Sequence, residues 1–236
     1  MLDLQIGPRL FGRSLWFTDD LFQQLRPYDL TIAPAVAASV EWYPAVPYTS
    51  GPASWFGVVA RGEYGLGLTS GDAQGRSYAT TSYALSVGGR ARWRVWRAEL
   101  AFTLAYDRRE FSIDRQSVTQ AQPEGIPNVT YESVRLGLSA RVQIIPRIAV
   151  RASGAFLVVA SAGEIDSDRY FPRSFVGGVE TTLGGAYELF RGFEVRLDLD
   201  WLRYFHSMNP VPGDRLVAGG AADDFYGATV SAAYRR

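Results

Sequence analysis

The chain has 236 residues, of which 47% are hydrophobic and 14% aromatic, so it is long enough for one or two domains with a sizeable core. Its 24 basic residues, all arginine, balance 24 acidic residues, whereas a nucleic-acid-binding domain normally carries a basic excess. Cysteine is absent and histidine occurs once, which excludes disulfides, thiol nucleophiles and Cys- or His-rich metal sites. We therefore expect no cofactor, no metal and no nucleic-acid partner.

Membrane-spanning helices are not expected, because no stretch of about 18 apolar residues is present. The first residues, MLDLQIGPRLFG, alternate between apolar and polar from the start. They lack the charged beginning and the apolar run of a signal peptide, so none is expected in this sequence.

Alternation of apolar with small or polar residues dominates the chain and predicts β-strands. The clearest case is 28–42, which is long compared with the usual globular strand of about 5–6 residues. Pro34 within it suggests a local break or bulge. In chain order, the predicted strands are 2–12, 28–42, 55–68, 80–93, 96–107, 130–144, 148–159, 176–189, 193–204 and 225–234. No linker divides them, so a single domain over residues 1–236 is predicted.

Three features favour a membrane barrel over a soluble β-sandwich, which would also alternate: the lengths of the connections, the lengths of the strands and the placement of the aromatic residues. The connections alternate in length: the turn at 94–95 is short, whereas the loops within 108–129 and 205–223 are long. The segment 83–93 is also long enough to span roughly 25 Å at a tilt near 45°, which is the apolar band of an outer-membrane barrel.

Aromatic residues collect at the strand ends, as expected for rings at lipid headgroup depth. On the side of the long loops they are Tyr28, Tyr64, Tyr83, Tyr106, Trp201 and Tyr226; on the side of the short turns they are Trp42, Trp93, Trp96, Tyr187, Phe193 and Tyr234.

With these features the chain resembles the small, ten-stranded class of bacterial (Gram-negative) outer-membrane β-barrel proteins over essentially its full length. The end, FYGATVSAAYRR, is similar to the C-terminal assembly signal of that class, with Gly227 followed by Val230, Ala232 and Tyr234, although it ends in two arginines rather than an aromatic residue. The resemblance implies an all-β, antiparallel up-and-down transmembrane barrel of about ten strands in the bacterial outer membrane.

The same resemblance implies short turns and both termini in the periplasm, and long loops outside the cell. Outer-membrane lipid or lipopolysaccharide is then an expected partner. Contacts of the loops or turns with other envelope proteins remain open.

The segment 88–100, GGRARWRVWRAEL, predicts a hairpin with Arg94 and Val95 as the turn. In that register Trp93 pairs with Trp96 and Arg92 with Arg97, so the apolar pairs face lipid and the charged pairs face the lumen. A slip of one residue would place arginine in lipid at a cost of about 2–4 kcal/mol each, so the register is expected to be well specified.

Charged residues opposite the apolar faces are predicted to line the lumen. They are Arg61, Glu63, Arg90, Arg92, Arg97, Glu99, Arg135, Arg141, Arg151, Glu180, Glu188, Glu194, Arg196, Asp198 and Asp200. A barrel of this size is only slightly wider than one filled by its own side chains, and the signs balance. An ion-paired plug is therefore favoured, and a narrow pore for small polar solutes is the alternative.

The functional expectation is a non-enzymatic structural or anchor protein, or a subunit of a cell-envelope assembly, with a largely plugged lumen. A porin-like channel is second and a surface enzyme third. The ten-stranded omptin-like surface proteases show an Asp-x-His spacing that is absent around His206. His206 and Ser207 would point to opposite faces of a strand, so we expect His206 to be a rim residue near the lipid headgroups. No catalytic residue is predicted.

Overall fold

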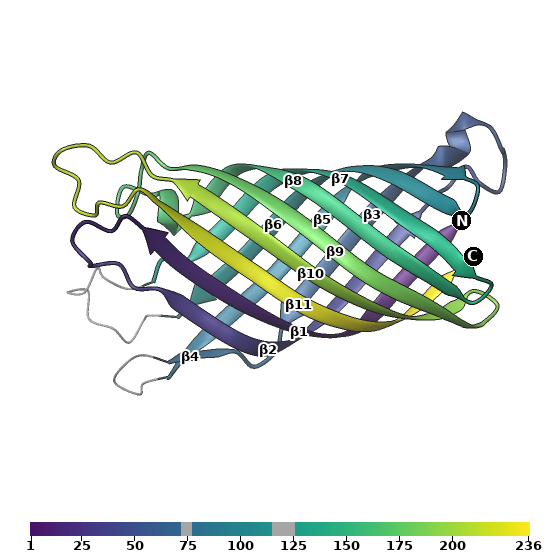
Figure 1. Cartoon of the computed structure of the whole chain (residues 1–236), viewed down its shortest axis with the longest axis horizontal. Coiled ribbons are helices and arrows are strands. Elements are labelled where there is room, and N and C mark those ends of the chain that lie inside the picture. The colour runs from purple at the N-terminus through teal and green to yellow at the C-terminus, as the bar shows by residue number, and fades with distance from the viewer. Residues whose placement is uncertain (72–76, 115–125) are drawn as a thin grey trace.

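The computed structural model describes residues 1–71, 77–114 and 126–236, and it forms a closed antiparallel β-barrel of ten long strands, as the sequence predicts (Figure 1). The strands are β1 (Leu2–Thr18), β2 (Tyr28–Trp42), β3 (Phe56–Gly65), β5 (Ser77–Val95), β6 (Ala98–Ile113), β7 (Val129–Ile145), β8 (Ile148–Gly163), β9 (Phe175–Phe190), β10 (Phe193–Ser207) and β11 (Gly220–Arg235). Pairing of β1 with β11 closes the barrel.

Three short elements complete the described chain. Strand β4 (Thr69–Gly71) pairs with the beginning of β5, beyond the end of β3. The 3-10 helices η1 (Pro52–Trp55) and η2 (Glu164–Asp166) lie in connections between strands. Within the described ranges, no helix has the length and apolar character needed to cross a membrane.

The two rims of the barrel differ in the length of their connections, which confirms the predicted alternation. Both chain ends lie at one rim, which we call the turn rim (Figure 1). It carries the tight turns 96–97, 146–147 and 191–192 and the longer connection 43–55. The opposite end, which we call the loop rim, carries longer connections such as 19–27, 164–174 and 208–219.

Several strands extend farther toward the loop rim than predicted. β1 continues to Thr18, β6 continues to Ile113 and β11 begins at Gly220. The reason is that the lumen at this end is apolar: Leu15 and Phe111 point inward and are fully buried. At these strand ends the outer face carries polar residues, such as Arg108 and Glu110 of β6, while the inner face is apolar, so the pattern of outward apolar and inward polar residues that reveals a lipid-facing strand ends there.

The predicted turn of the β5–β6 hairpin is wrong. Trp96 and Arg97 form the turn, and Trp93 pairs with Leu100 rather than with Trp96. Trp96 adopts a left-handed backbone conformation with φ of 55°. The register differs from the predicted one by an even number of residues, so the strand residues keep their faces, but Arg97 leaves the lumen for the exposed turn.

A bulge in β2 changes the face of one predicted girdle residue. The pairing with β1 shifts between Phe11 and Arg13, so that Thr31 and Ile32 stand opposite Gly12. This inserts one extra residue into the alternation. Tyr28 therefore points inward and is 7% exposed, which corrects its predicted place among the lipid-facing aromatics.

The outer wall between the aromatic rings is apolar and defines the membrane-spanning part. At the turn rim the ring consists of Trp42, Trp93, Tyr187, Phe193 and Tyr234; toward the loop rim it consists of Tyr64, Tyr83, Tyr106, Trp201 and Tyr226. Just beyond the second ring the outer face becomes charged, with an Arg203–Asp224 pair. Charged side chains on the lipid face are costly, so this pair marks the end of the spanning segments. Trp96 belongs to neither ring, because it lies at the tip of a turn and is 90% exposed.

Candidate functional site: the lumen

The lumen is filled by two layers of different chemistry. The half nearer the turn rim holds arginines and carboxylates, and we call it the polar layer. The half nearer the loop rim holds aromatic and aliphatic side chains, and we call it the apolar layer. Both arise from one rule of the barrel, that alternate residues of each strand point inward.

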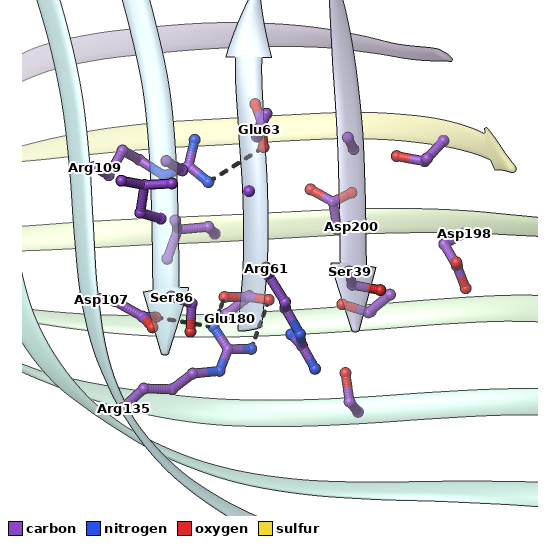
Figure 2. A pocket seen from close by; sticks show the side chains of 18 of the residues that line it. Ser39, Arg61, Glu63, Ser86, Asp107, Arg109, Arg135, Glu180, Asp198 and Asp200 are labelled. Atoms are coloured by element: carbon purple, nitrogen blue, oxygen red, sulfur yellow. Dashed lines mark hydrogen bonds and ion pairs between the residues drawn. The ribbon is translucent and has the colours of Figure 1, made fainter. Parts of the chain in front are cut away.

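At mid-height of the polar layer, Arg9 of β1 joins carboxylates of two other strands. Its Nη2 donates to Asp200 Oδ2 at 2.6 Å, and its Nε lies 3.2 Å from Glu63 Oε2. Arg109 approaches the same Glu63 carboxylate at 3.6 Å (Figure 2). Gly227 makes room for the guanidinium, because a Cβ at that position would lie 2.5 Å from Arg9 Nη2.

A second centre of the polar layer surrounds Arg135 on β7. Its guanidinium forms a forked pair with Glu180 of β9, in which Nη2 lies 2.7 Å from Oε1, and it also donates to Asp107 Oδ2 at 3.3 Å (Figure 2). Forked arginine–carboxylate pairs fix orientation as well as charge, so these side chains cross-brace strands β6, β7 and β9.

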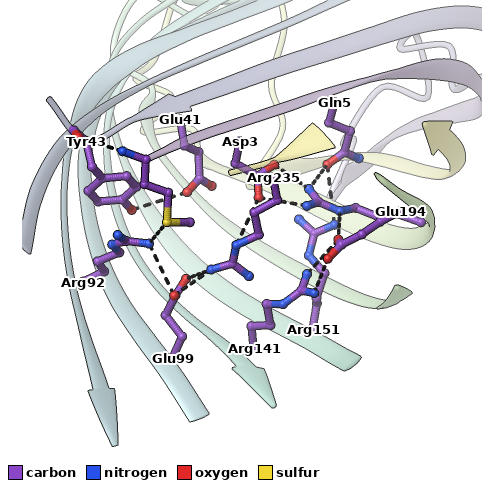
Figure 3. Close-up of polar contacts among 12 residues, drawn as sticks. Asp3, Gln5, Glu41, Tyr43, Arg92, Glu99, Arg141, Arg151, Glu194 and Arg235 are labelled. Carbon is purple, nitrogen blue, oxygen red and sulfur yellow. Dashed lines mark hydrogen bonds and ion pairs between the residues drawn. The ribbon is translucent and has the colours of Figure 1, made fainter. Parts of the chain in front are cut away.

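Close to the turn rim, the polar layer continues as a chain of shared carboxylates (Figure 3). Arg196 donates to both oxygens of Asp3 at 2.8 Å and, through Nε, to Glu194 at 2.8 Å. Arg141 reaches the same Glu194 from β7 at 2.5 Å. Because Glu194 accepts hydrogen bonds from two arginines, and Asp3 from both arms of Arg196, these contacts offset the cost of burying the charges.

Fourteen of the fifteen charged residues predicted to line the lumen lie on inward-facing strand positions, and Arg97 is the exception. This follows from the burial patterns of the strands that carry them. Prediction missed other inward-facing charges: Asp3, Arg9, Arg13, Arg109, Asp223 and Arg235. The signal for three of them was present, because Asp3, Arg9 and Arg13 all occupy odd-numbered positions of β1, as does the polar Gln5.

The polar layer contains a cavity of about 220 Å³. Arg61 lines it together with the hydroxyl-bearing Ser39 and Ser86 (Figure 2), and Thr182 also contributes to the lining. Among the residues that the structure describes, no carboxylate lies within ion-pairing distance of Arg61. A lone guanidinium beside water-sized space is the feature of this lumen that would attract a small anion.

The apolar layer closes the barrel above this cavity. Tyr131 of β7 and Tyr204 of β10 stack with ring centroids 3.7 Å apart, and Leu157 fills the space beside them. Tyr204, Leu157 and Leu202 also form the loop-side wall of the cavity. Side chains of the connections at the loop rim complete the layer, including Tyr170, Phe171, Met208 and Leu216.

A buried polar network lies inside the apolar layer. Arg13 donates through Nε and Nη2 to the two oxygens of Asp223, both at 2.8 Å. Tyr131 donates its hydroxyl to Asp223 at 2.8 Å and lies 3.1 Å from His206 Nε2. The Arg13 guanidinium also stacks over Phe111 at 4.3 Å from the ring centroid. The four polar side chains thereby compensate one another within an apolar environment.

His206 is thus not the rim residue that the sequence predicted. It points into the lumen, beyond the membrane-spanning segments, and is 5% exposed. Burial lowers the pKa of His206 to about 4, although the Asp223 carboxylate acts in the opposite direction. The imidazole is consequently neutral at pH 7, and its neighbour Ser207 faces outward and shares no hydrogen bond with it.

Comparison with known proteins identifies the fold. No protein-family model matches the chain, and no curated protein matches it. The chain is similar to the outer membrane protease OmpT from Escherichia coli, with a TM-score of 0.53, 11% identity and coverage of 99% of this chain and 95% of that one. A FadL homologue from Pseudomonas aeruginosa has a TM-score of 0.36 and 9% identity, over 99% and 90% of the two chains. At such identities the likeness to OmpT shows a shared fold, that of Gram-negative outer-membrane β-barrels.

Proposed function

From the outer-membrane β-barrel fold, we propose that this chain is a non-enzymatic anchor or scaffold of the cell envelope whose lumen is closed. The observation that carries the proposal is the succession of two filled layers along one bore. An ion-paired polar layer leaves a cavity of about 220 Å³, and the apolar layer covers that cavity on the loop side.

In this proposal the turn rim and both termini face the periplasm, and the loop rim faces outward. Its support is the alternation of tight turns with long connections, which is typical of outer-membrane barrels. The external connections would then present the surface that contacts lipopolysaccharide or other envelope proteins, while the barrel fixes that surface in the membrane.

Planar-bilayer recording tests the closed lumen. We expect purified, refolded protein to insert without producing discrete current steps, because both layers are packed with side chains. Insertion is verified separately by protection of the strands from protease in the same lipid. Stable openings of uniform size from inserted wild-type protein would overturn the proposal.

The second candidate is a narrow anion-selective channel, and the unpaired Arg61 beside the cavity is what favours it. If the lumen conducts, replacing Arg61 with Gln lowers the preference for anions, measured as the reversal potential across a salt gradient. An Arg97→Gln variant is the matched control, because it removes an equal charge from an exposed turn outside the lumen.

The proposal of a non-enzymatic role is supported by the burial of the only histidine. His206 and Asp223 lie inside the apolar layer, and Asp223 is 0% exposed. The likeness to OmpT concerns the fold and brings no proteolytic activity to this chain. Hydrolysis of a peptide or a lipid that disappears in a His206→Ala variant with an intact barrel would contradict this part of the proposal.

A further inference from the structure

We propose that a recess at the turn rim binds the phosphate headgroup of an anionic phospholipid. This inference deepens the proposed function and rests on its membrane placement. The recess lies against the connection 43–55 and has a volume of about 1300 Å³. Trp42, Trp55, Trp93 and Arg94 are among the residues that line it.

The first argument is the excess of positive charge at this rim. Each tight turn carries an arginine, namely Arg97, Arg147 and Arg191, and all three are exposed. None of the turns contains Asp or Glu. Because the whole chain is neutral, with 24 basic and 24 acidic residues, this excess reflects where charges are placed rather than a basic composition.

The second argument is that one carboxylate serves three arginines beside the recess. Glu99 accepts from Arg235 at 2.6 Å and lies 3.4 Å from Arg92 and 3.5 Å from Arg94 (Figure 3 shows Arg92, Glu99 and Arg235). Arg235 already occupies both oxygens of that carboxylate. Arg94, with 72% of its side chain exposed, therefore retains donors for an external anion.

The third argument is that the recess is continuous with the lipid-facing wall. Trp42 and Trp93 belong to the aromatic ring at the turn rim, and both line the recess. Tyr48, which is 89% exposed, lines it from the 43–55 connection. Amphipathic rings favour headgroup depth, so a lipid whose chains lie against the wall would bring its phosphate within reach of Arg94.

These features favour a lipid over a soluble anion or an acidic protein segment. A soluble anion would need no apolar lining, and a protein partner would need no continuity with the membrane-facing wall. The loop rim differs in that it mixes both signs, for example in the Arg173–Asp214 pair.

The experiment compares lipid retention in the intact barrel. Protein in nanodiscs of equimolar phosphatidylglycerol and phosphatidylcholine is released into mild detergent, and the lipids retained are counted by native mass spectrometry. Wild type should retain phosphatidylglycerol in preference to phosphatidylcholine, and Arg94→Gln should reduce that preference about fivefold, the effect of one arginine near an anionic surface.

Matched controls on the same rim are Arg147→Gln and Arg191→Gln, which remove the same charge from turns outside the recess; both should retain the wild-type preference. If all three variants lost the preference for phosphatidylglycerol equally, the lipid would be held by the exposed arginines of the whole rim, and the proposed site in the recess would be wrong. No preference in wild type would overturn the proposal altogether, as would displacement of the bound lipid by an acidic peptide alone. Retention in a nanodisc depends neither on which rim faces the periplasm nor on whether the lumen conducts, so failure here is distinguishable from failure of the proposed function.

Discussion

Arginine fills every basic position in this barrel, and its planar fork explains how a narrow lumen can hold so many charges. Arg196 uses separate nitrogens for Asp3 and Glu194, whereas Arg135 donates through Nη1 to both Glu180 and Asp107 and through Nη2 to Glu180 as well. Inward orientation of most charges was predictable from alternation. The pairing was not, because Arg135 on β7 reaches across β8 to Glu180 on β9, and contacts between non-adjacent strands depend on barrel closure.

The buried Arg13–Asp223 pair gives the first prediction at this scale. Asp223→Asn should lower the free energy of unfolding by about 3–5 kcal/mol, because it leaves the Arg13 charge uncompensated in the apolar layer. Urea unfolding of the barrel in vesicles measures the change.

The control for that measurement is Arg203→Gln, which breaks an outward-facing pair whose arginine side chain is 38% exposed. A partly solvated pair contributes about 1 kcal/mol or less. Similar losses in both variants would mean that the Arg13 site is more hydrated than its burial indicates.

The burial of His206 predicts how the stability of the barrel depends on pH. Its pKa is about 4 in the folded barrel, below the ordinary value of 6.5, so unfolding takes up a proton at intermediate pH. The stability associated with neutral His206 is complete above pH 6.5 and is lost as the pH falls toward 4, by about 3 kcal/mol in total. Unfolding midpoints measured from pH 7.5 to 4 should therefore decline more steeply for wild type than for His206→Gln. If the unfolding midpoints of wild type and His206→Gln changed in parallel with pH, the conclusion that His206 is buried in its neutral form would be wrong.

At the scale of elements, alternation predicts the strands and their faces but not their ends or their register. Any even shift of a hairpin keeps each side chain on its own face, so the pattern around Trp93 fits several turns equally well. The strand ends were missed where the lumen becomes apolar, as at Leu15 in β1. Pro34 indicated a break or bulge in β2 but neither its position nor its effect: the extra residue lies at Thr31 and Ile32, opposite Gly12, and it displaced Tyr28 from its predicted face.

Cysteine cross-linking distinguishes the two registers of the β5–β6 hairpin, in a chain that has no cysteine of its own. Ala91 and Phe102 are paired in the structure, whereas the sequence-based register pairs Ala91 with Ala98. Directly paired Cα atoms lie about 4.5–5.5 Å apart, within the range of a disulfide, whereas a displacement of four residues adds roughly 13 Å.

Ala91→Cys with Phe102→Cys should therefore form an intramolecular disulfide on mild oxidation, and Ala91→Cys with Ala98→Cys should not. Peptide mass spectrometry after alkylation of free thiols provides the readout. Efficient cross-linking of the second pair would instead support the register predicted from the sequence, with the turn at Arg94 and Val95.

For the molecule as a whole, the two layers act in series along one bore. The polar layer braces the membrane-spanning strands against one another, and the apolar layer anchors the connections at the loop rim, through residues such as Phe171 and Met208, to the barrel interior. In the proposed closed state, the barrel holds the surface at its loop rim rigidly, which suits an anchor. In that proposed state the resistance of the lumen to ions is the sum of the resistances of the two layers.

If the polar and apolar layers both close the lumen, one after the other, the conductance of the barrel should respond to mutations in a specific way. Replacing Arg135 and Glu180 together with Ser opens the polar layer without leaving either partner of that pair uncompensated. Replacing Leu157 and Tyr204 with Ala opens the wall between the cavity and the loops, at a cost of about 3–5 kcal/mol for each large side chain. Each pair of changes alone should leave the bilayer current at the wild-type level, because the other layer still blocks the bore. The four changes combined should give discrete openings. If the Leu157 and Tyr204 variant conducts by itself, the polar layer is already permeable, and the narrow channel becomes the better account of this barrel.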